Sequence, residues 1–231
     1  MSSPASTVLF DLDGTLLDTA PDLAAALNAT LQLNGRDALP FEYIRPVVSH
    51  GGRALIELGF GIDPQNPGFE PLRKQLLDLY EANIATHTSL FPGMAEVLEE
   101  LERRGIRWGV VTNKPGWLTE PLLDALGLSS RASCVVSGDT LEERKPHPAP
   151  LLHACTLAGS QPADTMYVGD AERDIEAGRN AGMRTLVALF GYLMEHDRPE
   201  DWGADALIKQ PADILEHLGH PPVTALQDHY K

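Results

Sequence analysis

Four aspartates, in two short segments far apart in the chain, have the type and spacing that a cation site requires. Asp11 and Asp13 lie in the segment DLDGT, and Asp170 and Asp174 lie in the segment GDAERD. Side chains two positions apart at the end of a strand point to the same side, and two like charges that close do not both stay ionised without a cation. A donor set of oxygens alone, without His or Cys, is typical of a hard cation. We therefore predict a Mg²⁺ site at these aspartates.

Polar residues in two further segments would complete a site for phosphoryl transfer. Thr112 and Asn113 offer a hydroxyl and an amide as hydrogen-bond donors, and Lys145 offers a fixed positive charge. Gly14 lets the backbone turn sharply beneath a ligand. Phosphoryl transfer needs neutralised phosphate oxygens, an in-line nucleophile and a group that handles protons. Carboxylates, a divalent cation, a lysine and neutral donors supply these functions, so we predict this reaction class.

Buried strands of a single sheet are needed to bring these segments together. Short apolar runs, each ended by polar residues or glycine, predict strands at Val8–Phe10, Arg107–Thr112, Ser133–Ser137, Thr165–Gly169 and Arg184–Leu189, with a weaker candidate at Ala206–Ile208. Helical periodicity lies between the later strands, and this alternation indicates an α/β fold with a doubly wound, mostly parallel sheet. In such sheets the ligand crevice lies at the carboxyl ends of the strands, where the polar segments stand.

The long interval between Asp13 and Arg107 departs from this alternation. It contains no convincing core strand, but helical periodicity predicts helices at about residues 21–33 and 72–84. The interval is far longer than an ordinary connection between strands. We therefore predict a small α-helical cap, residues 17–91, inserted into a catalytic α/β core of residues 1–16 and 92–219, followed by a tail at residues 220–231.

Each motif taken alone has an ordinary structural interpretation. DLDGT is compatible with a turn-forming loop, and an isolated Lys145 is compatible with a solvated surface lysine. Thr112 with Asn113 can cap a strand, and Asp170 with Asp174 can form the start of a helix. All four motifs stand in this order, each at the predicted carboxyl end of a strand or in the loop beyond it. That combination favours a functional site.

Together the four segments resemble the motifs of the haloacid-dehalogenase-like phosphohydrolase superfamily, and the similarity covers nearly the whole chain. Within the superfamily, VVTNKP (110–115) and KPHPAPL (145–151) resemble the phosphoglycolate phosphatases. The segments LFPGM (90–94), WGVVTNKP (108–115) and WGAD (202–205) also resemble the bacterial N-acetylmuramic acid 6-phosphate phosphatases. The resemblance implies a Rossmann-like core with an inserted helical cap, and a phosphatase activity.

The resemblance also implies a role for each aspartate. Asp11 would be the nucleophile that attacks phosphorus and forms an aspartyl-phosphate. Asp13 would protonate the departing alkoxide and then deprotonate the water that hydrolyses this intermediate. The Mg²⁺ ligands would be Asp11, the backbone carbonyl of Asp13, and Asp170. Asp174 and Gly14 would support the site, Asp174 through hydrogen bonds close to the metal.

The remaining motif residues would contact the substrate, according to the same resemblance. Thr112 and the backbone of Asn113 would bind non-bridging phosphate oxygens. Lys145 would neutralise negative charge between the phosphoryl group and the nucleophile.

The cap is expected to select the substrate by closing over the crevice. Its candidate contacts are the segment SHGGR (49–53), which has the composition of a small-residue loop opening a helix, and Arg45 upstream. Arg53 or Arg45 could hold a substrate carboxylate in a bidentate manner, or either could be a solvated arginine. Lys114 could likewise reach the substrate or remain a loop lysine. A carboxylate contact would not separate the two substrates named above, because both carry a carboxylate.

The composition limits the partners. The chain has 231 residues with 18 basic and 33 acidic side chains, so its net charge is −15. This field repels nucleic acid and anionic membranes, and a phosphorylated substrate would have to be met by a metal ion or a local group of cations. The sequence shows neither a secretory signal nor an apolar run of membrane length, and its two cysteines give no disulfide framework. We therefore expect a cytoplasmic protein, monomeric or homodimeric, whose partner is a small-molecule phosphate ester.

Two other functions fit part of this pattern. A sugar phosphomutase of the same superfamily would use the same aspartates but return the phosphoryl group to a bisphosphate; the short cap loop and VVTNKP favour hydrolysis instead. A non-enzymatic regulator with this fold would have no need of four intact motifs. The leading hypothesis is a Mg²⁺-dependent phosphomonoesterase for a small carboxylated or sugar phosphate.

Overall fold

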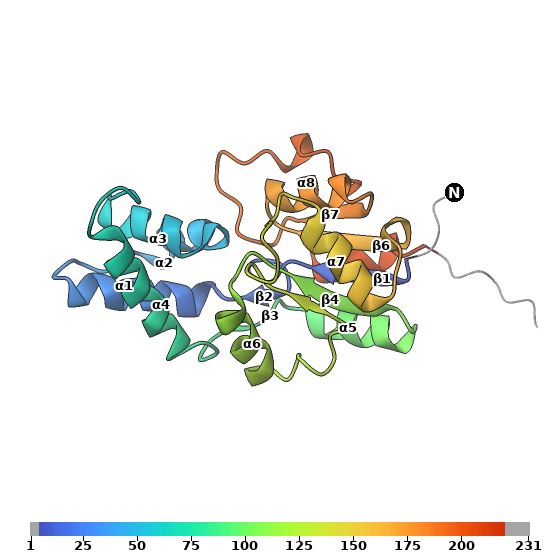
Figure 1. Cartoon of the computed structure of the whole chain (residues 1–231), viewed down its shortest axis with the longest axis horizontal. Coiled ribbons are helices and arrows are strands. Elements are labelled where there is room, and N and C mark those ends of the chain that lie inside the picture. The colour runs from blue at the N-terminus through green and yellow to red at the C-terminus, as the bar shows by residue number, and fades with distance from the viewer. Residues whose placement is uncertain (1–4, 220–231) are drawn as a thin grey trace, which may run out of the picture.

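Six parallel strands form the central sheet of the protein, in the order β5-β4-β1-β6-β7-β8. Figure 1 labels β4, β1, β6 and β7 among them. In that order their bounds are Val135–Val136, Arg107–Val111, Thr7–Phe10, Thr165–Gly169, Arg184–Ala188 and Ala206–Ile208. The computed structural model describes residues 5–219, so the tail predicted at residues 220–231 lies outside the described residues. The strand order reverses at β1, as a doubly wound sheet requires, and the predicted α/β fold class is confirmed.

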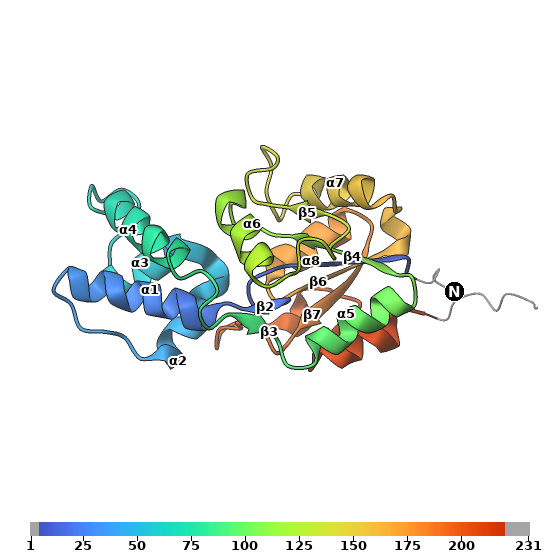
Figure 2. The ribbon, with the colours of Figure 1, turned by 90° about the horizontal axis from the view of Figure 1, so that it is seen from below.

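Alternate side chains of β1 pack on opposite faces of the sheet, which explains its continuous apolar sequence. Val8 and Phe10 belong to the core beneath α5 (Met94–Arg103) and the 3₁₀ helix η4 (Pro211–His217), whereas Leu9 belongs to the core beneath α7 (Ala149–Ala158) and α8 (Glu172–Asn180). Figure 2 shows these two pairs of helices on either side of the sheet. Burial of both faces favours the apolar runs from which the strands were predicted.

The register of the three central strands brings their carboxyl ends to the same level. Phe10 pairs with Val110 of β4 and with Val168 of β6. The residue after β1, Asp11, therefore leaves the sheet between the ends of β4 and β6. The same edge carries α6 (Gly116–Ala125), which begins shortly after β4.

The predicted helical cap is confirmed as a group of helices beside this edge of the sheet (Figure 1). It consists of α1, α2, the 3₁₀ helix η1, α3 and α4, whose bounds are Ala20–Leu33, Phe41–Ile44, Arg45–His50, Gly51–Phe60 and Phe69–Glu81. The chain enters the cap through β2 (Leu17–Asp18) and leaves it through β3 (Ser89–Leu90), which pair antiparallel. We propose the domain division at this pair, with residues 17–91 as the cap and residues 1–16 and 92–219 as the core.

Polar contacts hold both segments through which the chain enters and leaves the cap. The buried carboxylate of Asp22, in the first turn of α1, accepts hydrogen bonds from the backbone N–H and the hydroxyl of Thr88 at 2.8 and 2.7 Å. The phenol of Tyr192, in the core, donates to Asp18 at 2.7 Å and accepts from the backbone N–H of Ala20 at 2.9 Å. The start of the cap is thus attached to its own end and to the core.

The structure departs from the sequence prediction in its shortest elements. The strand predicted at Ser133–Ser137 is reduced to two residues, because only Val135 and Val136 pair in register with β4. Ser133 still donates its backbone N–H to Trp108 at 2.7 Å, so the chain follows β4 outside the ladder. β2 and β3, with two residues each, are too short to show periodicity. Among the helices within residues 5–219, none is long and apolar enough to cross a bilayer.

Candidate active site

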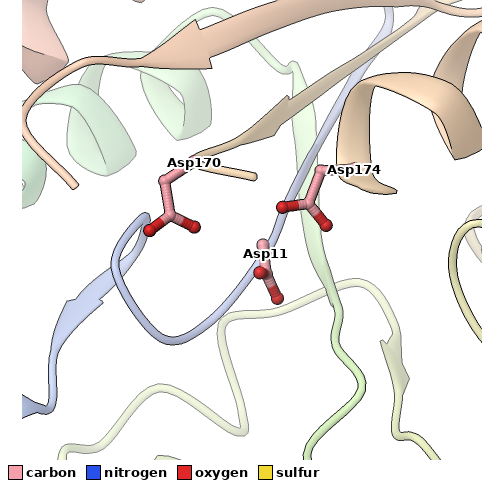
Figure 3. Close-up of side chains that lie close together, drawn as sticks. All are labelled: Asp11, Asp170 and Asp174. Carbon is pink, nitrogen blue, oxygen red and sulfur yellow. The ribbon is translucent and has the colours of Figure 1, made fainter. Parts of the chain in front are cut away.

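Three of the four predicted aspartates form a buried cluster at the carboxyl edge of the sheet. Asp11 follows β1, Asp170 follows β6, and Asp174 lies in the first turn of α8. One carboxylate oxygen of each lies within 4.8 Å of the others, and all three residues are buried (Figure 3). The fold therefore brings these three carboxylates together, whereas the sequence predicts all four aspartates at the site, and the carboxylate of Asp13 lies outside the cluster.

Burial and mutual repulsion make this cluster unfavourable as a set of bare charges. Burial, followed by the charges of Asp11 and Asp174, raises the pKa of Asp170 to about 7. Burial and Asp174 also raise the pKa of Asp11. Burial alone would raise the pKa of Asp174 as well, but the cations of Lys145 and Arg173 outweigh it and lower that pKa below its ordinary value. A divalent cation would relieve the repulsion between Asp11 and Asp170.

Lys145 is the cation within this cluster. Its side chain is 1% exposed, and its Nζ lies 2.9 Å from Oδ1 of Asp11 and 2.7 Å from Oδ1 of Asp174. Nζ also donates to the carbonyl of Val111 at 3.0 Å and to the phenol of Tyr167 at 2.7 Å. Oxygen atoms thus surround the ammonium and hold it next to the predicted nucleophile. Sequence reasoning missed Tyr167, whose position inside a buried strand gives no signal of a polar role.

Asp11 and Asp13 have different surroundings although they are two residues apart. Oδ1 of Asp11 accepts the backbone N–H of Leu12 at 2.7 Å in addition to its contact with Lys145. The Asp13 carboxylate lies outside the cluster of three, and its Oδ1 accepts the hydroxyl of Thr19 at 2.6 Å and Nζ of Lys114 at 3.0 Å. The two carboxylates are therefore held by separate sets of groups.

The segment after β4 places Thr112 and Asn113 beside the cluster. Oγ1 of Thr112 accepts the backbone N–H of Lys114 at 3.1 Å, so its own proton can be donated to a ligand. The amide of Asn113 makes two reciprocal bonds to the backbone of Lys145: it donates to the carbonyl at 3.0 Å and accepts the N–H at 3.1 Å. The side chain of Asn113 thereby fixes the loop that carries Lys145.

Gly14 is required by the close approach of the chain to Asp170. Its φ is +86°, in the region that favours glycine. A Cβ atom at this position would overlap the carboxylate of Asp170 and would lie 2.9 Å from Cδ2 of Tyr192. The glycine in DLDGT thus allows the turn to pass directly against a predicted metal ligand.

A cap residue reaches the aspartate cluster. Ser49, at the end of η1, donates its hydroxyl to Oδ2 of Asp170 at 2.7 Å, and the guanidinium of Arg173 donates to the backbone carbonyl of Ser49 at 2.7 Å. Ser49 stands in the SHGGR segment singled out in the sequence, and α3 does begin at Gly51. No sequence signal indicated Arg173, which lies between two motif aspartates on α8.

A cavity of about 1050 Å³ separates the cap from the core and opens onto the site. Core residues that line it include Asp11, Asp13, Thr112, Asn113, Lys114, Trp117 and Arg144, and cap residues include Ser49, Arg53, Arg73, Lys74, Leu77 and Tyr80. Its size slightly exceeds the roughly 300–1,000 Å³ that is usual for small-molecule sites.

The two arginines considered for the substrate carboxylate lie in different places. Arg53 lines the cavity, with a side chain that is 67% exposed and paired with Glu57 at 2.9 Å. Arg45 is outside the residues that line the cavity. Its guanidinium donates to the carbonyls of Gly191 and Phe190, both at 3.2 Å, and stacks 4.9 Å from the ring centroid of Tyr192. In this structure Arg45 joins the cap to the core, and only Arg53 is placed to meet a ligand.

Comparison with known proteins identifies relatives over nearly the whole chain. The family described as "Haloacid dehalogenase-like hydrolase" matches residues 8–188. The N-acetylmuramic acid 6-phosphate phosphatase of Pseudomonas putida is 44% identical over 207 residues, which cover 90% of this chain and 93% of the relative. The phosphoglycolate phosphatase of Xanthomonas campestris pv. campestris is 45% identical over 215 residues, 93% of this chain and 96% of the relative.

A solved structure has the same architecture. The crystal structure of a predicted phosphoglycolate phosphatase from Haemophilus somnus matches with a TM-score of 0.81 at 28% identity, covering 94% of this chain and 99% of that chain. The sheet, the cap and their connection are therefore shared with an experimentally determined fold.

Proposed function

The chain belongs to the haloacid dehalogenase-like hydrolase family and is a phosphatase, and from this premise we propose that it hydrolyses a carboxylated phosphate monoester, with Mg²⁺ as cofactor and Asp11 as nucleophile. The observation that carries the proposal is the buried cluster of Asp11, Asp170 and Asp174, in which Lys145 contacts Asp11 and Asp174 and Asp11 also lines the cavity.

The donor set of the cluster fits Mg²⁺. All candidate ligand atoms are oxygens, and they are buried. Burial first, and then the charge of a neighbouring carboxylate, raises the pKa of both Asp11 and Asp170, and a divalent cation would offset both effects. Asp11, Asp170 and the backbone carbonyl of Asp13 would hold the ion. Bound Mg²⁺ would supply positive charge to the phosphoryl oxygens.

In the first step the Asp11 carboxylate bonds to phosphorus while the bond from phosphorus to the ester oxygen breaks. Lys145 and the N–H of Leu12 both contact Oδ1, so Oδ2 is the oxygen available for attack. Asp13 donates its proton to the departing oxygen, so that an alcohol leaves rather than an alkoxide.

In the second step water hydrolyses the phosphoaspartate. Asp13 takes a proton from the water, the water oxygen bonds to phosphorus, and the bond to Oδ2 breaks, which restores Asp11 and releases phosphate. The hydroxyl of Thr112, the backbone of Asn113 and the ammonium of Lys145 bind the phosphoryl oxygens during both steps. The hydrogen bonds between Asn113 and the backbone of Lys145 keep these groups in register.

The size and lining of the cavity favour a sugar acid phosphate over a two-carbon acid phosphate. A volume of about 1050 Å³ far exceeds what a two-carbon acid needs, and Trp117, 43% exposed, presents an aromatic surface on which a sugar ring can pack. Arg53 and Arg144 both line this cavity and are candidate partners for the carboxylate. N-acetylmuramic acid 6-phosphate is therefore the first candidate substrate. Phosphoglycolate is the second, because a relative of that name is 45% identical.

Phosphate release by the purified protein tests the proposal. With Mg²⁺, the wild type should hydrolyse N-acetylmuramic acid 6-phosphate with a higher kcat/KM than 2-phosphoglycolate, and excess EDTA should abolish both activities. An Asp11→Asn variant should lose about 10³-fold or more, while Asp124→Asn, an equal charge change at an exposed position on α6, should keep full activity. Substantial turnover by Asp11→Asn, or turnover unaffected by EDTA, would refute the mechanism.

A further inference from the structure

Lys114 is buried where the cap meets the predicted acid–base residue. Its side chain is 6% exposed, and its Nζ lies 3.0 Å from Oδ1 of Asp13 and 4.5 Å from the ring centroid of Tyr80 in cap helix α4. Tyr80 itself is fully buried. A buried ammonium is stable only when charged and polar partners compensate its lost hydration, so the position of Lys114 depends on both neighbours.

The other cavity-lining lysine in the described chain provides a contrast. Lys74 lies on α4, the helix that carries Tyr80. Its side chain is 76% exposed and pairs with Asp78, one turn along the same helix. Each of the two lysines places one positive charge at the cavity. Only Lys114 connects a residue of the core reaction site to a residue of the cap.

The contacts of Asp13 determine which of its oxygens is free to meet a substrate. Thr19 and Lys114 both donate to Oδ1, at 2.6 and 3.0 Å. Because both donors contact Oδ1, Oδ2 is the oxygen left free to meet a substrate. Asp13 also lines the cavity. The two donors therefore orient the carboxyl group and leave its second oxygen for the ester oxygen of a substrate.

We propose that Lys114 is a positioning residue for proton transfer: its ammonium, held over the Tyr80 ring, fixes the Asp13 carboxyl group toward the leaving oxygen, so that the cap contributes to this orientation through Tyr80. This inference rests on the proposed function, in which Asp13 protonates the leaving group.

Three phosphate esters separate this role from the two other roles open to a lysine at this place. Glycerol 1-phosphate has an uncharged alkyl leaving group, 2-phosphoglycolate has a carboxylated alkyl leaving group, and p-nitrophenyl phosphate releases a stable anion that needs a proton least. A lysine that orients the general acid affects both alkyl esters. A lysine that binds a substrate carboxylate affects 2-phosphoglycolate alone. A lysine that merely adds positive charge near phosphate affects all three esters equally.

We expect Lys114→Met to lower kcat/KM for both alkyl esters by about 10²-fold, the lower end of the usual contribution of general acid catalysis. The loss for p-nitrophenyl phosphate should be at least tenfold smaller. Lys114→Arg, which keeps the charge, should recover part of the alkyl activity. Lys74→Met is the matched control for loss of one positive charge and should change all three esters by one common factor. Retained p-nitrophenyl phosphate turnover shows that a variant is folded.

The contribution of the cap is tested at Tyr80. Tyr80→Leu removes the ring and should reproduce the pattern of Lys114→Met with a smaller loss, whereas Tyr80→Phe keeps the ring face and should retain more alkyl activity than Tyr80→Leu. An equal loss on all three esters in Lys114→Met, or a loss confined to 2-phosphoglycolate, would overturn the inference while leaving the proposed function intact. If the wild type with Mg²⁺ hydrolyses neither these three esters nor N-acetylmuramic acid 6-phosphate, the proposed function itself fails.

Discussion

An alanine at position 14 would place a methyl group where the Asp170 carboxylate now lies. Gly35, at the end of α1 in the cap, is a matched control because it also has a positive φ, +70° against +86°, but no atom lies within 4 Å of the place that a Cβ would take there. Both Gly14→Ala and Gly35→Ala therefore lose folding free energy because alanine is unfavourable at a positive φ. Only Gly14→Ala also creates a steric overlap. The difference between the two variants reports on the position of Asp170.

The two costs can be estimated separately. A non-glycine residue in the left-handed region costs about 1–2 kcal/mol, and for a protein of this size 1 kcal/mol lowers Tm by roughly 2–4 °C. Gly35→Ala should lose this amount of stability and keep its activity. In Gly14→Ala the added methyl group also forces the Asp170 carboxylate away, because Tyr192, 2.9 Å from the Cβ position, closes the other side. Displacement of a metal ligand or its support weakens metal binding by roughly 10–100-fold.

The measurement is the Mg²⁺ dependence of turnover for both variants and the wild type, together with thermal unfolding in EDTA. We expect a half-saturating Mg²⁺ concentration that is roughly 10–100-fold higher for Gly14→Ala only, and a Tm loss in EDTA that is at least as large as that of Gly35→Ala. If Gly14→Ala requires no more Mg²⁺ than Gly35→Ala, then either Asp170 is not a ligand or the contact with Gly14 does not fix it.

Three other contacts give further predictions. Mg²⁺ should raise Tm more at pH 8 than at pH 6. The pKa of Asp170 is raised from 3.8 to about 7, so the stability that its proton contributes is lost as the pH rises through about 7, and the cation then takes the place of the proton. Equal rises in Tm at the two pH values in a calorimetric scan would contradict this prediction. Tyr167→Phe should lower kcat by roughly tenfold with little change in KM, because Lys145 loses a hydrogen bond worth about 1.5–3 kcal/mol and keeps its bond to Val111. Steady-state kinetics of the variant measures both constants. Asp22→Ala should lower the free energy of unfolding by about 2–3 kcal/mol, since it leaves the N–H and hydroxyl of Thr88 without their acceptor, and urea titration of the variant measures this loss.

The parts of the fold that could be predicted from sequence are those in which one local pattern has one structural solution. The run before Asp11 is apolar without alternation because both faces of β1 are covered, and Pro21 occupies the first turn of α1. The lack of a core strand between Asp13 and Arg107 correctly predicted the helical cap. By contrast, β5 is cut to two residues by the register of its single neighbour, β4, which no local pattern encodes.

The parts of the site that could not be predicted are contacts between distant segments. Ser49 and Asp170 are 121 positions apart, and Lys114 and Asp13 are 101 apart. Arg45 and Arg53 illustrate the same limit: both are cap arginines with equal chemical suitability, yet the 3₁₀ turn that carries Arg45 directs it to two core carbonyls. Residue type identifies which chemistry is available, whereas the packing of cap on core decides which residues take part.

The distribution of charge shows how a strongly acidic protein can bind an anionic ester. With 33 acidic and 18 basic side chains, the field at long range repels phosphate. Among the described residues, six basic side chains line the cavity, Arg53, Arg73, Lys74, Lys114, Arg144 and Arg173, but only four acidic ones do, Asp11, Asp13, Glu70 and Asp78. The cavity thus holds a third of all the basic side chains and about an eighth of the acidic ones. Because salt screens charges beyond roughly 8–10 Å, the nearby cations govern a substrate at the cavity, and the distant acids do not oppose its binding.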